Sequence, residues 1–179
     1  MDFSYSYEEF EYPNLERVLR EMGARMQEFM RAHLEQNGTN ASSKLSNSIQ
    51  YLIQKDGQDY EIQISLEDYW KWVENGTQAH WPPRDKIAEW IRVKPVIPEP
   101  DKNGKLPTVE QLSFLISRAM AGQSPNQAEL KNPNGGTQAQ PFFWNSVEEA
   151  VAEFEDRVGE AIAKDIDQLV ETMLISILL

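Results

Sequence analysis

Histidine and carboxylate side chains are the groups in this chain that could support catalysis or metal binding. His80, one of two histidines, lies close in sequence to Asp68, Glu74 and Asp85. A histidine beside carboxylates can act in acid–base catalysis or bind a metal ion. The spacing fits no known ligand motif, and Trp81-Pro82-Pro83 is explained as packing. We therefore predict no catalytic, cofactor-binding or metal-binding residues, and no cofactor.

Two other groups of side chains could do chemistry. The carboxylates near the C-terminus could form a metal-dependent nuclease site, but they are spread around a predicted helix, which is typical of a solvated face. The five tryptophans could stack on bases or sugars, but such sites come with a basic groove. The chain has 17 Lys and Arg against 29 Asp and Glu, a formal net charge of −12, which argues against nucleic-acid binding. Packing explains the tryptophans better.

The composition is that of an ordinary globular protein. The 179 residues suit one domain, or one domain with extensions, and the 40% apolar content is enough for one core. The absence of cysteine excludes disulfides and thiolate chemistry. The first residues lack the pattern of a signal peptide, and no apolar run reaches the roughly 20 residues that span a bilayer. We therefore expect a cytoplasmic product.

Apolar periodicity and turn residues predict the elements that must position any site. Steps of three and four residues predict a helix over residues 14–36. The polar residues 39–47 predict a loop. Two alternating runs, 48–54 and 60–66, flank an Asp56-Gly57 turn and predict an antiparallel hairpin with one buried face.

The second half of the chain is predicted to be helical, with two long loops. Short helices are predicted over residues 69–73, 84–93 and 108–121, and the loops over 94–106 and 123–138. Asp68 is expected to cap the first of these helices. A long C-terminal helix is expected to begin at Asn145 or Ser146, because Ser146 and Glu149 have capping-box spacing. From Phe142 on there are nine acidic residues and two basic ones, so this helix carries more than half of the excess charge.

These elements predict an α+β fold. A small antiparallel sheet of three to five strands packs against long N-terminal and C-terminal helices, with extended loops. Residues 1–13 form an N-terminal arm, and its first 12 residues are either an edge strand or an extended segment on a neighbouring surface. Residues 14–179 form a single α+β domain.

Two blocks of the chain combine an aromatic cluster with a Gly-Thr pair. The first, Tyr69 to Thr77, reads Y-W-K-W-V-E-N-G-T, and the second, Gly136 to Trp144, reads G-T-Q-A-Q-P-F-F-W. Neither block supplies a set of catalytic groups. Both are typical of fixed corners of a scaffold, which favours a role in assembly over a role in chemistry.

Three motifs, taken in order, resemble those of the phage tail-component, or tail-completion (neck), family, typified by the gene-ten product of a lambdoid siphophage. They are Ser43-Lys44-Leu45-Ser46-Asn47-Ser48-Ile49; the block 69–77 with a following corner at Pro82; and Ala139-Gln140-Pro141-Phe142-Phe143-Trp144 before a long helix. The resemblance covers most of residues 14–178. The chain departs from the family pattern in having Ser42-Ser43 for Thr-Gly, Trp70 for a small residue, and long loops.

The resemblance implies a structural virion protein without a reaction. It implies a homo-oligomeric ring, expected to be a hexamer, in the neck between the head connector or stopper protein and the tail tube or tail terminator. DNA would only pass through the lumen, and no membrane is involved. The protein would be in the host cytoplasm during assembly and in the virion afterwards. The structural motif residues are Leu45, Ser48, Ile49, Tyr69, Val73, Glu74, Gly76, Thr77, Pro82, Pro141 and Phe142.

Physical roles follow for three of the motif residues. Gly76 is suited to a backbone geometry that other residues resist. Glu74 is expected to hold the turn or a neighbouring chain by hydrogen bonds. Pro141 directs Phe142 and Phe143 into the core before the last helix starts.

Contact segments are expected in the arm 1–12, the loops 94–106 and 123–138, and the apolar end 173–179. The candidate interface residues are Phe3, Tyr5, Tyr7, Pro98, Pro100, Leu130, Met173 and Leu178. An acidic lumen that keeps DNA from sticking is a further hypothesis. A ring with the acidic face of the last helix turned outward would exclude it.

Two other functions stay open. The chain could be a monomeric acidic protein-binding module, for example an inhibitor of a basic enzyme, and finding it in purified virions at a multiple of six copies would exclude this. It could also be a small hydrolase that uses His80 and nearby carboxylates, which an unchanged phenotype of His80→Ala would exclude.

Overall fold

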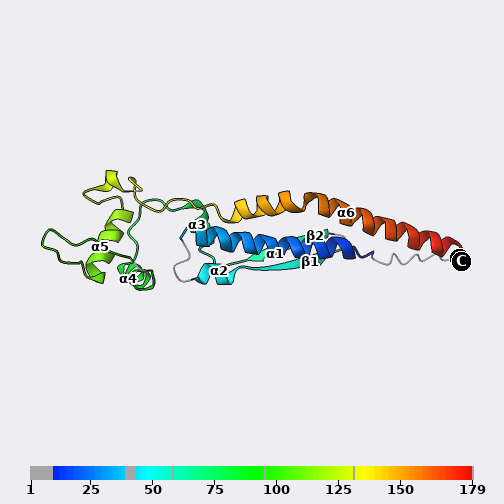
Figure 1. Ribbon diagram of the computed structural model, residues 1–179, viewed down its shortest axis with the longest axis horizontal. Helices are drawn as coiled ribbons and strands as arrows, with labels where there is room; N and C mark the ends of the chain where they lie inside the picture. The colour runs from blue at the N-terminus through cyan, green and yellow to red at the C-terminus, as the bar shows by residue number, and fades with distance from the viewer. Residues whose placement is uncertain (1–9, 39–42, 58, 95, 131, 179) are drawn as a thin grey trace. The chain divides into compact units, whose positions relative to one another are not determined.

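The fold belongs to the predicted α+β class and is mostly helical. A computed structural model describes residues 10–38, 43–57, 59–94, 96–130 and 132–178. Of residues 176–178 it describes the backbone alone. The elements are α1 Pro13–Gln36, α2 Lys44–Ser48, β1 Gln50–Asp56, β2 Asp59–Ser65, α3 Trp70–Asn75, α4 Arg84–Val93, α5 Val109–Met120, the 3-10 helix η1 Gln127–Glu129, and α6 Phe143–Leu178 (Figure 1). Within these described ranges the sheet has two strands, so the prediction of three to five was wrong.

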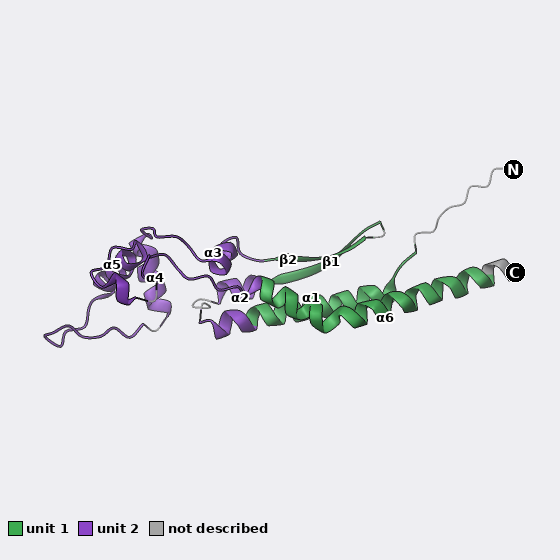
Figure 2. Cartoon of the chain, turned by 90° about the horizontal axis from the view of Figure 1, so that it is seen from above, with its two compact units in different colours: residues 1–31, 49–65, 144–179 green, residues 32–48, 66–143 purple. Residues whose placement is uncertain are grey.

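The contacts of the chain divide it into two compact units. Unit 1 comprises residues 1–31, 49–65 and 144–179, and unit 2 comprises residues 32–48 and 66–143 (Figure 2). Unit 1 contains 7 Lys and Arg against 19 Asp and Glu, whereas unit 2 contains 10 of each. The whole net charge of −12 therefore belongs to unit 1, and unit 2 is neutral. The predicted division into an arm and a single domain stays a prediction.

The predicted hairpin is confirmed. β1 and β2 pair antiparallel from Gln50↔Ser65 to Asp56↔Asp59, and exposed and half-buried side chains alternate along both strands. Gly57 has a φ of +59°, which supports the tight turn because glycine adopts positive φ without steric cost. The alternation in the sequence predicts which face is shielded, since successive side chains of a strand point to opposite faces.

The hairpin packs closely on α1, whose predicted position is also confirmed. A Cβ atom added at Gly23 would lie 2.5 Å from the Cδ2 atom of Tyr51. Nearby, Gln27 Nε2 donates a hydrogen bond to the carbonyl of Ile49 at 2.5 Å, and the Ile49 side chain is fully buried. The missing side chain of Gly23 therefore makes room for the Tyr51 ring in the middle of a helix.

Helix α1 also lies alongside α6, as both views show (Figures 1 and 2). The buried apolar side chains of unit 1 recur at helical steps on these helices: Val18, Met22, Met26 and Met30 on α1, and Ala150, Phe154 and Ala161 on α6. A helix that presents one apolar stripe is stabilised mainly by burying it against another element.

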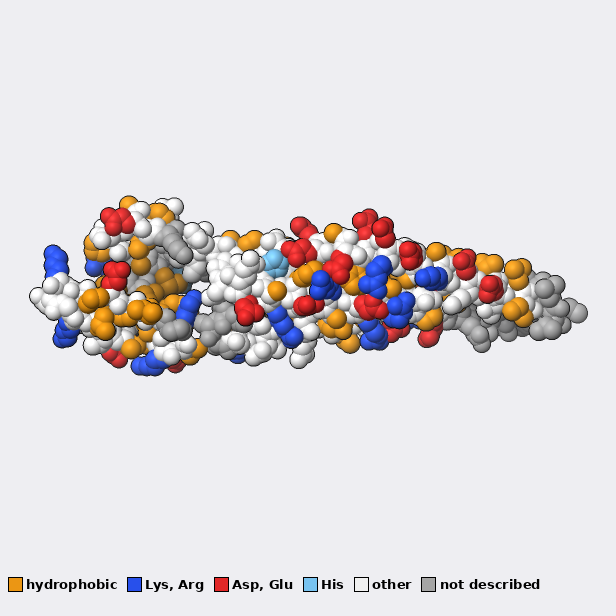
Figure 3. Space-filling model, in the orientation of Figure 1, with side chains coloured by type: hydrophobic (Ala, Val, Ile, Leu, Met, Phe, Trp, Pro, Cys, Tyr) orange, Lys and Arg blue, Asp and Glu red, His pale blue; other side chains and the backbone are white. Residues whose placement is uncertain are grey.

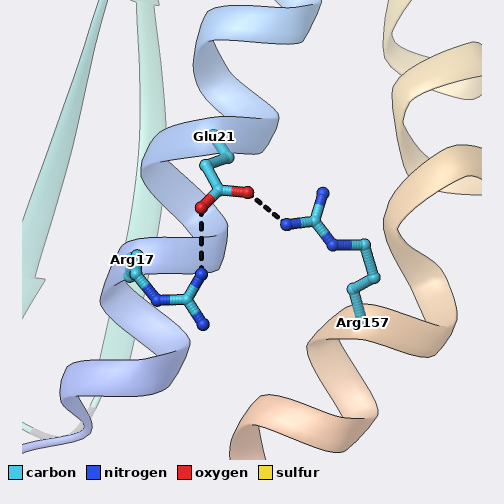
Figure 4. A network of polar contacts seen from close by, with 3 residues as sticks. All are labelled: Arg17, Glu21 and Arg157. Carbon is cyan, nitrogen blue, oxygen red and sulfur yellow. Dashed lines mark hydrogen bonds and ion pairs between the residues drawn. The ribbon is translucent and has the colours of Figure 1, made fainter.

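Exposed ion pairs align the two helices. The Glu21 carboxylate accepts hydrogen bonds from Arg17 of its own helix, at 3.0 Å, and from Arg157 of α6 (Figure 4). The hydrogen bond from Arg157 is the main cause that lowers the pKa of the Glu21 carboxyl below its usual value. Arg25 donates to Glu153 at 2.9 Å, and this bond raises the pKa of the Arg25 guanidinium. Exposed pairs contribute little stability, so their effect is mainly on alignment.

A buried carboxylate fixes the start of α1. Asp165 of α6 is fully buried, and its Oδ1 accepts hydrogen bonds from the backbone N–H of Asn14 at 3.0 Å and from Asn14 Nδ2 at 2.7 Å. Its Oδ2 accepts the backbone N–H of Leu15 at 2.8 Å. Pro13 has no N–H to satisfy, so Asp165 takes up the free donors at the start of this helix. The prediction that placed Asp165 on a solvated face was wrong.

Unit 2 contains the confirmed helices α4 and α5, which pack on each other. Thr108 and Gln111 form a capping box, in which the Gln111 N–H donates to Thr108 Oγ1 at 3.3 Å and the Thr108 N–H donates to Gln111 Oε1 at 3.0 Å. This reciprocal pairing satisfies two free donors at the helix start. Residues 96–106 contain no helix or strand, as predicted for this loop.

Two local predictions were wrong and a third was confirmed in the main. The segment 39–47, expected to be a loop, ends in the helix α2, where the burial of Leu45 compensates for a polar composition. Asp68 does not cap α3, because the cap position is Tyr69, without a side-chain hydrogen bond. In its described residues, the segment 123–138 is a loop, as predicted, apart from η1 and the bridge residue Thr137, and it contains the buried Gly135 and Gly136, whose backbones are hydrogen-bonded.

Helix α6 also begins earlier than predicted. It starts at Phe143 instead of Asn145 or Ser146, and Ser146 is buried inside the helix. Of the N-terminal arm, residues 1–9 lie outside the described residues, and residues 10–12 are not in a strand.

The cap formed by Asp165 predicts a large effect for one aspartate on a helix that carries many. We expect Asp165→Ala to lower the free energy of unfolding by about 1–3 kcal/mol, because it leaves backbone N–H groups of α1 without an acceptor. Asp167→Ala, at an exposed position of the same helix, is the matched control and should change stability little. Urea unfolding measures both, and equal effects would contradict the cap.

Substitution of two helical glycines by alanine should change the free energy of unfolding in opposite directions. Gly23→Ala should destabilise the protein by about 1–3 kcal/mol, because the new methyl group overlaps the Tyr51 ring. Gly159→Ala meets nothing within 4 Å and should stabilise α6 by about 0.5–1 kcal/mol. Thermal unfolding of the two variants checks this, and a stabilised Gly23→Ala protein would show that the hairpin does not rest on α1 in this way.

Candidate functional site

The two Gly-Thr blocks meet in unit 2 and form what we call the Gly-Thr junction, residues 73–77 with 136–143. Thr77 and Thr137 form an isolated antiparallel bridge, in which the N–H of each donates to the carbonyl of the other at 3.1 Å. Their hydroxyl oxygens also lie 3.1 Å apart. The bridge joins positions that are 60 residues apart in the chain, so it closes the segment that carries α4 and α5.

Glycines allow the backbones to come this close. Gly76 has φ +70° and ψ −174°, a combination that is essentially restricted to glycine. A Cβ atom there would lie 2.7 Å from the Ala139 nitrogen and closer still to the Thr137 carbonyl oxygen. Gly136 has φ +73°, and a Cβ atom added there would overlap the Thr77 carbonyl oxygen even more closely. No side chain fits at either position, which explains why glycine precedes threonine in both blocks.

Glu74 ties the junction to the start of α6. Its side chain is 4% exposed, and its Oε2 accepts the backbone N–H of Phe143 at 2.8 Å. The N–H of Gln140 donates to the carbonyls of Val73 and Glu74 at 3.0 and 3.1 Å. A carboxylate at a helix N-terminus satisfies a free donor and interacts favourably with the helix dipole. Glu74 therefore supplies a cap for α6 from α3.

Aromatic packing closes the same region. Phe142 is fully buried, and the rings of Trp70 and Phe143 lie 4.7 Å apart. Pro141 is exposed and precedes them. The junction thus consists of a backbone bridge and a carboxylate cap, and the ring of Trp70 packs on its Phe143.

Leu45 and Ser48 of the first motif form hydrogen bonds with residues at and just before Tyr69 in unit 2. Leu45 is buried, Ser48 Oγ donates to the Leu45 carbonyl at 2.8 Å, and the same hydroxyl accepts the Glu67 N–H at 3.1 Å. Burial raises the pKa of the Tyr69 hydroxyl, Glu67 adds to this, and a backbone hydrogen bond with Leu45 opposes it. The remaining motif residues are Ile49, buried at the start of the hairpin, and Pro82, half-buried after the junction.

A recess of about 320 Å³ lies beside the junction. It is lined mainly by apolar and neutral groups: Tyr69, Trp72, Val73, Thr77, His80, Met120, Thr137, Gln138 and Gln140. His80 is exposed. Its backbone N–H donates to the Met120 carbonyl at 3.2 Å, and its ring Nδ1 lies 2.9 Å from the Gln78 carbonyl oxygen. Over the described ranges, no group of three or more His, Cys, Asp and Glu residues could hold a metal ion.

Exposed apolar residues lie on the C-terminal part of α6 and around α5, where Leu115 is on the helix and Leu106 and Leu130 are outside it (Figure 3). Of the predicted interface residues, Leu130 and Met173 are exposed, as is Pro100, while Pro98 is half-buried. The Leu178 side chain and the residues Phe3, Tyr5 and Tyr7 lie outside the described part. Leu106 and Leu174 are exposed within the predicted contact segments 94–106 and 173–179. Sequence reasoning missed Leu115, Ile166 and Val170, which are exposed outside those segments.

Comparison with protein-family models, with curated proteins and with solved structures finds no match to this chain. In the part of the chain that the structure describes, no helix has the length and hydrophobicity needed to cross a membrane.

The Gly-Thr junction predicts a position-specific cost for alanine. We expect Gly76→Ala to lower the free energy of unfolding by about 2 kcal/mol or more beyond Gly104→Ala, because the methyl group would overlap the backbone near Thr137. Gly104 is the matched control: its φ is +75°, but a Cβ atom there meets nothing within 4 Å. Urea unfolding compares them, and similar losses would mean that positive φ alone explains Gly76.

Proposed function

We propose that this chain is a structural protein of the phage neck that completes the tail. It forms a homo-oligomeric ring, expected to be a hexamer, between the head connector or stopper protein and the tail tube or terminator. The proposal needs no cofactor and no reaction. Its starting point is the ordered set of motifs at residues 43–49, 69–77 and 139–144.

The observation that carries the proposal is the meeting of the second and third motifs. Glu74 and the Thr77 and Thr137 backbones are engaged in capping and bridging within the chain. Motif residues that are engaged in contacts within the chain are typical of a structural protein, whose function is to hold binding surfaces in position. Exposed apolar side chains on two separate parts of the chain supply surfaces that other proteins could cover.

The distribution of charge supports the same function. A ring through which DNA passes gains from acidic groups near the channel, because like charges prevent the phosphate backbone from binding. Unit 1 holds the whole excess of acidic residues, and unit 2 is neutral. A neutral unit is better suited to contact with neighbouring subunits, where like charges would oppose assembly.

Complementation in vitro tests the function. Heads and tails from a lysate that lacks this polypeptide should remain unjoined, and purified wild-type protein should restore infectious particles. Gly57→Ala, at a glycine of positive φ with nothing within 4 Å and outside the predicted contact segments, should restore them equally. Gly76→Ala should restore fewer, because it disturbs the junction. The number of plaques and electron micrographs of the particles are the readouts.

Complete infectious particles formed without this polypeptide would overturn the proposal. So would turnover of a substrate by the purified protein that is lost in His80→Ala, since that outcome favours the hydrolase.

A further inference from the structure

The C-terminal part of α6 carries a stripe of half-exposed apolar side chains. Ile166, Val170, Met173, Leu174 and Ile175 are between 46% and 60% exposed. They follow Asp165, which binds the N-terminus of α1, so this stripe begins where the packing of α1 on α6 ends. Residues 166, 170 and 173 recur at steps of four and three, which places them along one side of the helix. Leu174 lies on the same side, one turn beyond Val170, whereas Ile175 faces the opposite side. We call Ile166, Val170, Met173 and Leu174 the α6 stripe.

A second apolar surface lies on α5 in unit 2. Hollows of about 490 and 380 Å³ adjoin at Leu115, which lines both. The first is also lined by Leu106, Pro107 and Phe114, and the second by Leu130. The Leu106, Leu115 and Leu130 side chains are exposed. We call this surface the α5 groove.

The charges of the two units decide which surface would cover the stripe. Packing stripe against stripe would bring together two copies of unit 1, each with a net charge of −12, and like charges oppose association. The α5 groove belongs to the neutral unit 2. Its rim carries charges of both signs, with Lys105 beside Glu99 and Asp101. It therefore does not strongly repel Asp167 and Glu171 near the stripe.

We propose that the α6 stripe of one copy of this chain binds in the α5 groove of a second copy. This inference rests on the proposed function and specifies the contact that builds the ring. Two different surfaces that pair head to tail form a heterologous interface, and such interfaces generate closed rings when the rotation between subunits closes. Both surfaces are present once in every copy, so each copy contributes its stripe to one neighbour and its groove to the other.

The size of the contact explains why the ring would be cooperative. The helical segment 166–178 is about 20 Å long, at 1.5 Å per residue. Its apolar side is too small to bury the roughly 800 Å² per partner that a standard stable interface requires. A closed ring lets every copy hold two such contacts at once, which raises the stability of the assembly well above that of an isolated pair.

Charge-introducing variants of each surface, mixed together, test this pairing. We expect Leu174→Glu and Leu115→Glu each to weaken self-association at least tenfold in sedimentation equilibrium at high protein concentration. Gln168→Glu and Gln123→Glu add the same charge at exposed positions outside the stripe and the groove, and should self-associate like the wild type. Circular dichroism and urea unfolding of all four variants serve as the control that each is folded.

The mixture of the two defective variants is decisive. The Leu174→Glu copy keeps an intact groove and the Leu115→Glu copy keeps an intact stripe, so together they should form a one-to-one dimer that grows no further. Self-association of Leu115→Glu at the wild-type level would show stripe-to-stripe pairing and overturn the inference. A wild-type protein that remains monomeric at every concentration, or a mixture without a dimer, would also overturn it.

The two proposals fail in different ways. If Leu115→Glu and Leu174→Glu both restore infectious particles in the complementation assay, the ring contact is wrong while the neck function stands. If wild-type protein is not needed for infectious particles but the variants still pair as expected, the neck function is wrong while the head-to-tail contact stands.

Discussion

The free N–H groups at the start of a helix need acceptors, and this requirement organises the protein. The two longest helices both obtain an acceptor from a distant part of the chain. Asp165 of α6 accepts the first amides of α1, and Glu74 of α3 accepts the first amide of α6. Both carboxylates are buried, where an unpaired charge is costly and a paired one is strongly directional. Each cap therefore fixes where one helix begins relative to another element.

The Gly-Thr junction meets a second constraint, which is backbone proximity. The bridge between Thr77 and Thr137 requires that two chain segments pass each other at hydrogen-bonding distance. Gly76 and Gly136 make this possible because neither position has room for a side chain. The Glu74 cap lies directly beside this crossing, so the bridge and the start of α6 hold each other in place. A substitution at one of them should be felt at the other, because neighbouring sites couple.

Elements with a local cause could be predicted from the sequence. The periodicity of α1, the alternation of the hairpin strands and the Thr108 cap of α5 depend on residues that are close in the chain. The start of α6 was predicted two or three residues late, since its cap comes from Glu74, 69 positions away. Asp165 was placed in solvent for the same reason, as nothing in its neighbourhood along the chain reveals the amides of Asn14 and Leu15. The number of strands was overestimated: the alternating pattern of the arm allowed an edge strand, but its described residues 10–12 are not in one.

The same distinction between local and distant causes applies to the candidate site. The glycines, Glu74 and the aromatic residues of the two blocks could be selected from the sequence, yet their meeting could not, because it depends on how the intervening segment folds back. The exposed Leu115 of α5 belongs to an apolar helical pattern that also contributes to the core, so the sequence did not reveal its exposure. The acidic excess of the last helix could be read from the sequence, but the neutrality of unit 2 could not, because unit 2 is formed from separate stretches of the chain. A net charge of −12 confined to one unit predicts which surfaces repel each other. That asymmetry is what makes a head-to-tail contact more favourable than one between like surfaces.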